Sequence, residues 1–272
     1  MFKTPNLKPW KRISLMQRST CSILNVLAAA LVLAFGTRAL AADPAPTEKT
    51  NKWETSAGLG FALATGNSES VLFTANFLTQ HKDDKNEIRF GADGGYGEAK
   101  SASDPNASME KNTAFVRGAA QYNRLFSEKL YGYVRAEGLY DEIADIDYRV
   151  TLSPGAGYYF IKNERTLLSA EVGPGYIFEK VGGDANDYAT LRVAERFEFK
   201  LSKTARLFQA AEYLPEVTDF GNYIINGVLG LEADITKKMA VRLLLQDTYD
   251  NVPAPGRKCN DLKLTAGLQY KF

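Results

Sequence analysis

The sequence predicts an all-β protein, a transmembrane antiparallel up-and-down β-barrel of about 12 strands behind a cleaved signal peptide. Three observations predict this fold: apolar and polar residues alternate up to the last residue, about twelve such segments follow one another, and the amino terminus resembles an export signal. Successive side chains of a strand point to opposite faces, so alternation gives each segment one apolar and one polar face. In a membrane barrel, one face meets lipid and the other meets the lumen.

The carboxy-terminal segment, 262–272, shows the alternation most clearly. Leu264, Leu268, Tyr270 and Phe272 share the apolar parity, whereas mostly polar residues occupy the other parity. A terminal strand that ends in an aromatic residue resembles the end of bacterial outer-membrane barrels, which the barrel assembly machinery recognises. We therefore expect Phe272, Tyr270 and Leu268 to form an assembly signal. The expected partners during biogenesis are that machinery and periplasmic chaperones.

The amino terminus has the layout of a secretory signal peptide. Basic residues precede an apolar run at about 23–35, and Ala-Leu-Ala at 39–41 forms a cleavage site of the A-x-A kind. Two alternatives stay open, an uncleaved membrane anchor and a start codon at Met16 rather than Met1. The expected division of the chain is signal peptide 1–41, short periplasmic tether 42–52 and outer-membrane barrel 53–272.

Composition restricts the class of function only slightly. The chain has 272 residues, of which 45% are hydrophobic and 24% charged, and its formal net charge is +1. Such averages are uninformative for barrels, because polar lumen residues dilute the apolar lipid-facing ones. Nucleic-acid binding requires a basic footprint. The near-neutral charge therefore predicts no nucleic-acid partner.

Turn signals divide the barrel region into twelve alternating segments. The first two, for example, place Leu59 and Phe61, then Phe73 and Phe77, on the apolar parity. The ninth is the least clear, because Phe208 falls on its polar parity. The first six segments are expected at about 53–65, 70–80, 88–96, 114–126, 130–140 and 148–160. The last six are expected at about 166–180, 191–199, 207–213, 223–235, 241–246 and 262–272.

The connectors alternate in length, which predicts an orientation. Compact connectors are expected at 81–86, 127–129, 161–165, 202–204 and 236–238. Longer ones, rich in Gly, Pro, Asp or Asn, are expected at 100–112, 181–187, 215–222 and 250–260, although the connector at 66–68 is short. Outer-membrane barrels have short periplasmic turns and longer outer loops. Aromatic residues near both ends of the segments predict two interfacial girdles.

Two residues break the alternation. Glu195 and Gln209 fall on the apolar parity of the eighth and ninth segments. A carboxylate facing lipid near mid-depth would cost about 2–4 kcal/mol or less. We therefore favour a β-bulge or a register one residue away over a functional lipid-facing site.

Charges of both signs occupy the inward parity in nearly equal numbers. A barrel of twelve strands has a backbone radius of about 12 Å, so either a narrow aqueous lumen or a closed interior fits. Balanced charges suit an ion-pair network and equally a weakly selective pore. The lumen-lining candidates are Asp93, Arg117, Arg135, Glu137, Glu171, Arg192, Arg196 and Glu212.

Catalytic chemistry finds little support in the sequence. Barrel enzymes mostly use a histidine as base, and the single histidine, His81, falls in a predicted periplasmic turn with no recognisable Ser or Asp partners. We expect a solvated turn histidine, no cofactor, no metal site and no enzymatic activity.

The chain resembles a known family along nearly all of its barrel region. The resemblance rests on the segments at 53–60 and 65–70, which include Thr-Gly-Asn-Ser, on 207–215, and on the ending Leu-Gln-Tyr-Lys-Phe. These segments are similar to those of the putative salt-induced outer membrane proteins, a family of unknown function. The resemblance implies a barrel in the bacterial outer membrane, and the family name suggests a link to salt or osmotic stress.

The sequence leaves three functional hypotheses open. The first is a narrow, non-enzymatic outer-membrane channel for small solutes or ions. The second is a closed structural or envelope-interaction barrel, and the third and weakest is a barrel enzyme. Outer-membrane lipid and lipopolysaccharide are the expected surroundings in each case.

Overall fold

The computed structural model describes residues 53–64, 69–100 and 108–272, and all regular structure in these residues is β-strand. The expected signal peptide and tether lie outside the described residues. The twelve strands are β1 (Trp53–Ala64), β2 (Ser70–Lys82), β3 (Asn86–Ala99), β4 (Glu110–Leu125), β5 (Leu130–Asp141), β6 (Ile146–Lys162), β7 (Thr166–Val181), β8 (Asp184–Lys200), β9 (Ala205–Pro215), β10 (Tyr223–Asp234), β11 (Met239–Asp250) and β12 (Asn260–Lys271).

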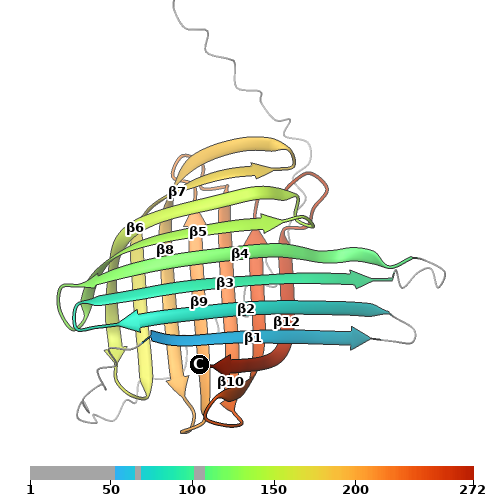
Figure 1. The fold of residues 1–272 in the computed structure, drawn as a ribbon. Coiled ribbons are helices and arrows are strands. Elements are labelled where there is room, and N and C mark those ends of the chain that lie inside the picture. Colours follow the sequence, from blue (N-terminus) through green and yellow to red (C-terminus); the bar gives the residue numbers. More distant parts are fainter. Residues whose placement is uncertain (1–52, 65–68, 101–107) are drawn as a thin grey trace, which may run out of the picture.

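The strands form a closed antiparallel barrel in which each strand pairs with the next and β12 pairs with β1 (Figure 1). The predicted antiparallel β-barrel of about 12 strands is therefore confirmed. Strands on the near side of Figure 1 cross those on the far side at a steep angle, as expected because closing a sheet requires strand tilt. The closure between β1 and β12 is short. Its pairs run only from Ser56↔Lys271 to Gly60↔Gly267, whereas β1 pairs with β2 along its whole length.

The barrel has two ends that differ in their connectors. We call one the turn end; it holds both ends of the barrel chain and the connectors 83–85, 126–129, 163–165, 201–204 and 235–238. The opposite end, which we call the loop end, holds the longer connectors 216–222 and 251–259. The predicted long connector at 181–187 is wrong. Only Gly182 and Gly183 separate β7 from β8, and their φ angles of 60° and 85° suit a two-residue hairpin turn.

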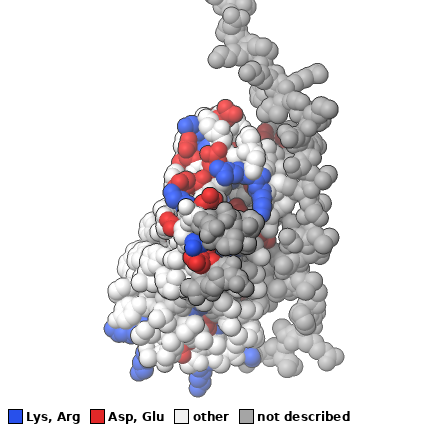
Figure 2. Space-filling view, turned by 90° about the vertical axis from the view of Figure 1, so that its right-hand side faces the viewer, with Lys and Arg blue, Asp and Glu red and all other residues white. Residues whose placement is uncertain are grey.

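The outer face of the barrel is apolar. Leu59 on β1, Val116 on β4 and Leu264 on β12 are each at least 60% exposed, and many Leu, Val and Phe side chains are exposed beside them. Figure 2 shows a broad surface without charged residues between a charged upper region and the basic residues at the lower edge. A closed barrel pairs most of its backbone groups between neighbouring strands, so it can present such a face to lipid. The chain is a transmembrane β-barrel.

His81 lies inside β2 rather than in a turn, so its predicted position is wrong. It pairs across the ladder with Trp53, and the two ring centroids are 5.2 Å apart. The strand extends two residues beyond its expected end, and the tight turn 83–85 follows, capped by the Asp83 carboxylate. His81 therefore packs against an aromatic side chain on the outer face near the turn end.

The expected bulge or register error at Glu195 and Gln209 is also wrong. Pairing of β8 with β7 and with β9 runs without a register shift, so Glu195 shares its face with the exposed Val193. The two residues meet on the outer face, where the Gln209 amide donates a hydrogen bond of 2.8 Å to the Glu195 carboxylate. This bond satisfies part of the polar surface, which lowers the cost of placing it there.

Small packed cores occupy part of the barrel interior. At the loop end, Ile177, Tyr188, Leu214 and Ile224 form a buried apolar cluster on the inner wall. At the turn end, the rings of β5 and β6 pack together, with the Tyr131 and Tyr159 centroids 4.8 Å apart.

Inward aromatic rings lie over glycines of the neighbouring strand. Tyr133 is paired with Gly155, and Phe115 is paired with Gly95. A Cβ atom at Gly95 would lie 2.7 Å from the Phe115 ring. The glycines thus let the rings lie along the wall instead of projecting across the lumen.

Candidate functional site

Two cavities lie inside the lumen. The central cavity has a volume of about 390 Å³ and is lined by side chains from most of the strands. The loop-end cavity has a volume of about 420 Å³ and is partly covered by residues 253–259 of the last loop. The residues that line both cavities are Phe115, Arg117, Glu137, Asn226 and Gln246. Side chains rather than backbone therefore separate the two cavities.

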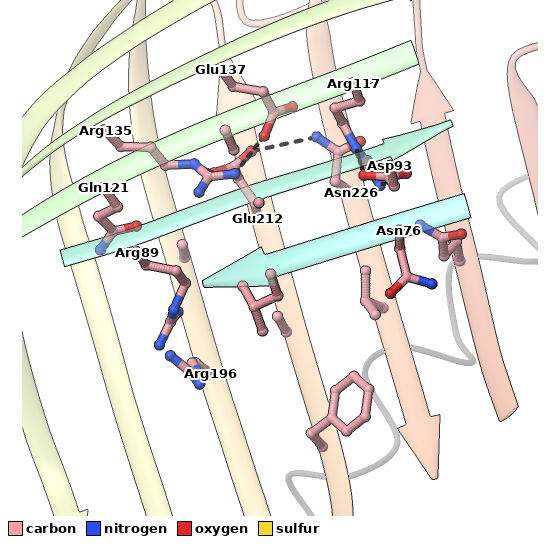
Figure 3. Close-up of a pocket in the computed structure, with 18 of the residues that line it drawn as sticks. Asn76, Arg89, Asp93, Arg117, Gln121, Arg135, Glu137, Arg196, Glu212 and Asn226 are labelled. Carbon is pink, nitrogen blue, oxygen red and sulfur yellow. Dashed lines mark hydrogen bonds and ion pairs between the residues drawn. The ribbon is translucent and has the colours of Figure 1, made fainter. Parts of the chain in front are cut away.

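All eight lumen-lining candidates from the sequence line the central cavity. Figure 3 shows several of them, from β3, β4, β5, β8 and β9, projecting into one space. The arrangement follows from strand parity, because each of these residues occupies the inward parity of its strand. Which residues of opposite walls meet depends on the closure of the barrel.

Arg192 on β8 is the centre of the ion-pair network. Its guanidinium contacts Glu171 on β7 at 2.7 Å and Glu212 on β9 at 2.5 Å, and it lies over the Tyr133 ring. Arg192 is only 4% exposed. Two carboxylates on the adjacent strands therefore neutralise this buried cation through charge-assisted hydrogen bonds.

The network extends across the lumen to β4 and β5. Gln121 donates a hydrogen bond of 2.7 Å to Glu171, and Tyr131 donates one of 2.9 Å to the same carboxylate. Arg135 binds Glu137 on its own strand and approaches Glu212 at 3.8 Å. The bonds to Glu171 and the approach of Arg135 to Glu212 join strands that are not neighbours in the sheet, so they link separate parts of the barrel wall.

Asp93 and Arg117 form a separate pair on the other side of the central cavity. Two parallel hydrogen bonds of 3.0 Å join the carboxylate on β3 to the guanidinium on β4. The two residues are direct cross-strand partners, and both side chains stay about one quarter exposed. The pair borders the partition between the cavities, because Arg117 lines both.

Two carboxylates at the turn end complete the interior, and neither was among the eight lumen-lining candidates named from the sequence. Glu232 is 1% exposed and contacts Arg206, Arg242 and Lys271 at 3.1, 2.7 and 3.2 Å. Glu87 accepts a hydrogen bond of 2.5 Å from Tyr159 on β6. Inward parity identifies both positions, but only the folded barrel shows how many partners surround each.

A further cluster outside the eight named candidates lies at the loop end. Arg149 on β6 contacts Glu179 on β7 at 2.5 Å and Asp250 on β11 at 2.8 Å. Lys263 on β12 faces Asp141 on β5 at 3.7 Å. These pairs border the loop-end cavity, so charged residues line the lumen along its whole height.

The expected assembly-signal residues lie on the outer face at the turn end. Leu268, Tyr270 and Phe272 are 51%, 40% and 74% exposed, and the Tyr270 and Phe272 ring centroids are 5.0 Å apart. The backbone N–H of Phe272 donates to the carbonyl of Thr55, which extends the closure by one bond. The three side chains thus form one apolar strip beside the closure.

In the described residues 53–64, 69–100 and 108–272, no group of three or more His, Cys, Asp or Glu side chains is arranged to hold a metal ion. Within the same residues, no helix is long and apolar enough to cross a membrane.

Comparison with known sequences places the chain in a family. The profile of the family described as "Protein of unknown function, DUF481" matches residues 57–272, which include all of the barrel except its first four residues. The chain belongs to this family. No curated protein is similar enough in sequence to count as a match. The resemblance stated from the sequence is thus confirmed for the DUF481 family.

The solved structures that are similar to this DUF481 protein share little of its amino-acid sequence. An outer membrane channel from Pseudomonas putida F1 is 10% identical with a TM-score of 0.48, over 86% of this chain and 100% of that chain. The NanC porin is 7% identical with a TM-score of 0.49, over 80% and 100% of the two chains. The translocator domain of autotransporter NalP from Neisseria meningitidis is 13% identical with a TM-score of 0.42, over 81% and 87%.

Proposed function

We propose that this protein is a narrow, non-enzymatic channel of the bacterial outer membrane for small solutes or ions. The observation that carries the proposal is the pair of charged cavities inside the lumen, which only side chains separate. Side chains on the barrel wall change conformation far more readily than a segment of backbone that fills the lumen. Opposing charges along the wall suit a weakly selective passage.

The location and orientation follow from the barrel itself. Short turns and both chain ends characterise the periplasmic side of such barrels, so the turn end faces the periplasm and the loop end faces outward. Lipid and lipopolysaccharide surround the apolar face. The assembly machinery and periplasmic chaperones act on the strip formed by Leu268, Tyr270 and Phe272 during biogenesis. We propose that the channel acts under salt or osmotic stress.

Absence of catalysis is part of the proposal, and the surroundings of His81 support it. The ring packs on Trp53 at the apolar outer face, on the parity opposite to the inward charges. The carboxylates inside the lumen contact arginines, lysines, tyrosines or amides, which suits structural and electrostatic roles.

A closed structural barrel is the second candidate, and the density of the ion-pair network favours it. Arg192 and Glu232 are 4% and 1% exposed, so parts of the lumen are dry. Buried charges that are fully paired can hold opposite walls together without any passage. The two candidates differ in one measurable property, electrical conductance.

Conductance of the purified, refolded protein in planar bilayers tests the proposal. The informative variant is the double substitution Asp93→Ala with Arg117→Ala, which removes a complete ion pair at the partition between the cavities. A channel is expected to conduct in the wild-type form and to show a larger unit conductance in this variant.

The matched control removes an ion pair outside the lumen. Lys111 contacts Glu142 at 2.7 Å, and both side chains are more than one third exposed. Lys111→Ala with Glu142→Ala should leave the unit conductance unchanged. A folded wild-type protein that stays electrically silent over a wide range of salt concentration would remove the channel proposal and leave the closed barrel.

A further inference from the structure

The acidic residues around the central cavity already have partners. Asp93 and Glu137 bind arginines of the same wall, and Glu171 and Glu212 share Arg192. Glu195 points to the outer face and accepts its bond from Gln209. None of these carboxylates contacts Arg89 or Arg196, whereas Arg242, which also lines the cavity, binds Glu232.

Arg89 lies on the inward parity of β3, toward the turn end. Its cross-strand neighbours are Gln80 on β2 and Gln121 on β4, both uncharged. Within the part of the chain that the structure describes, Arg89 has no hydrogen bond or ion pair to a side chain, although its side chain lines the central cavity. Its guanidinium thus offers five donors to whatever occupies the cavity.

Arg196 reaches into the same space from β8, on the opposite wall. Figure 3 shows Arg89 and Arg196 extending toward each other within the cavity. Glu198 binds one edge of the Arg196 guanidinium. Lys82 at the end of β2 interacts electrostatically with Arg196 and also with Glu54, Glu87 and Glu198. Glu87 already binds Tyr159, Asn123 and Lys162, so it is engaged by partners other than Arg89 and Arg196.

Two cations that face each other across a cavity repel, and the repulsion grows as water is excluded. An anion between them would remove the repulsion. The planar guanidinium fork matches the two oxygens of a carboxylate. A cavity of about 390 Å³ has room for a small organic molecule.

We propose that Arg89 and Arg196 form a binding site for the carboxylate group of a small organic anion. The site deepens the proposed channel function, on which it rests for the route by which the anion reaches the lumen. It makes the central cavity a selective step, because an anion is held there whereas a neutral molecule of the same shape is not.

Equilibrium binding tests the site without requiring conductance. Succinate is titrated into the refolded protein at low salt by calorimetry, with succinamide as the neutral analogue and inorganic phosphate as a second anion. Succinate is expected to bind, and succinamide is not. Arg89→Gln and Arg196→Gln should each weaken succinate binding about tenfold, as the loss of one charge-assisted bond implies.

The control is Arg124→Gln, which changes the net charge equally at an exposed position outside the lumen. Arg124 lies at the turn end of β4, where it binds Asn86, and its loss should leave succinate affinity unchanged. If a glutamine variant fails to fold, Arg89→Lys and Arg196→Lys replace it, because these variants keep the positive charge. They should retain more affinity than the glutamine variants while still binding more weakly than wild type.

Each contrary result has a defined meaning. Succinate affinity that is equal in wild type and in both glutamine variants would overturn the site, and so would equal binding of succinamide. Tighter binding of phosphate than of succinate would overturn the carboxylate assignment. A protein that binds succinate through these arginines but never conducts would retain the site and lose the channel. A protein that conducts but does not bind succinate through these arginines would retain the channel and lose the site.

Discussion

Replacing Arg192 by glutamine is the most direct perturbation of the lumen network. The change removes the cation that contacts Glu171 at 2.7 Å and Glu212 at 2.5 Å, at a position only 4% exposed. Glutamine is too short to reach both carboxylates. Two negative side chains, on the strands that flank β8, are then left without their shared cation.

The expected loss follows from the contacts that disappear and those that remain. A hydrogen bond to a charged group contributes about 1.5–3 kcal/mol, and two are removed. Glu171 keeps its bonds from Tyr131 and Gln121, whereas Glu212 keeps only Asn226 at 3.4 Å and Arg135 at 3.8 Å. The remaining donors offset part of the loss, so we expect Arg192→Gln to lower the free energy of unfolding by about 3–5 kcal/mol.

Urea unfolding of the refolded barrel in lipid vesicles measures this difference, with tryptophan fluorescence and gel mobility without heating as probes. Arg124→Gln serves as the exposed control and should change the free energy of unfolding little. Adding Glu171→Gln and Glu212→Gln to Arg192→Gln should restore much of the loss, because no unpaired charge remains. A loss below about 1 kcal/mol for Arg192→Gln would refute the reasoning. It would mean that water already solvates these carboxylates.

Three further predictions concern the wall, the assembly signal and the orientation. Gly95→Ala should lower the free energy of unfolding by about 1–3 kcal/mol in the same assay, because an aromatic ring fills the space of the added methyl group. The control is Gly118→Ala, which should change the free energy of unfolding little because no atom lies within 4 Å of the new Cβ. Phe272→Ser should reduce the amount of heat-modifiable barrel in outer-membrane fractions, and unchanged assembly would make the terminal ring incidental. Thr218→Cys, in a loop-end connector, should react with an impermeant maleimide on intact cells, while Glu128→Cys should not; the opposite labelling would reverse the orientation.

The alternation of residues was sufficient to predict the strands and their faces. Leu59 and Val116, for example, lie on the exposed outer face that their parity indicated. Strand ends were less predictable, since residues 184–187 are polar on both parities yet continue β8 beyond the apolar band. His81 was misplaced for a related reason. A histidine between glutamine and lysine looks polar in sequence, whereas in the barrel its ring packs on Trp53.

The partners inside the lumen could not be predicted from parity alone. Parity indicates that Arg135 and Glu212 both point inward, but their approach depends on the tilt and stagger with which the sheet closes. Glu195 illustrates the opposite error, because one charge on the apolar parity suggested a bulge. The hydrogen bond from Gln209, which comes from the adjacent strand, makes the regular register tolerable.

The short pairing between β1 and β12 has a consequence for how the barrel moves. Opening the ring at any other line would break a longer run of backbone hydrogen bonds, so local opening has its lowest free energy along Ser56–Gly60. Gly60 and Gly267 meet on this line and contribute no side-chain packing to it. Amide protons of β12 that bond to β1 should therefore exchange with solvent deuterium sooner than those that bond to β11. The pairing between β1 and β12 is thus the weakest contact between strands of the barrel, and both local opening and mechanical unfolding should begin there.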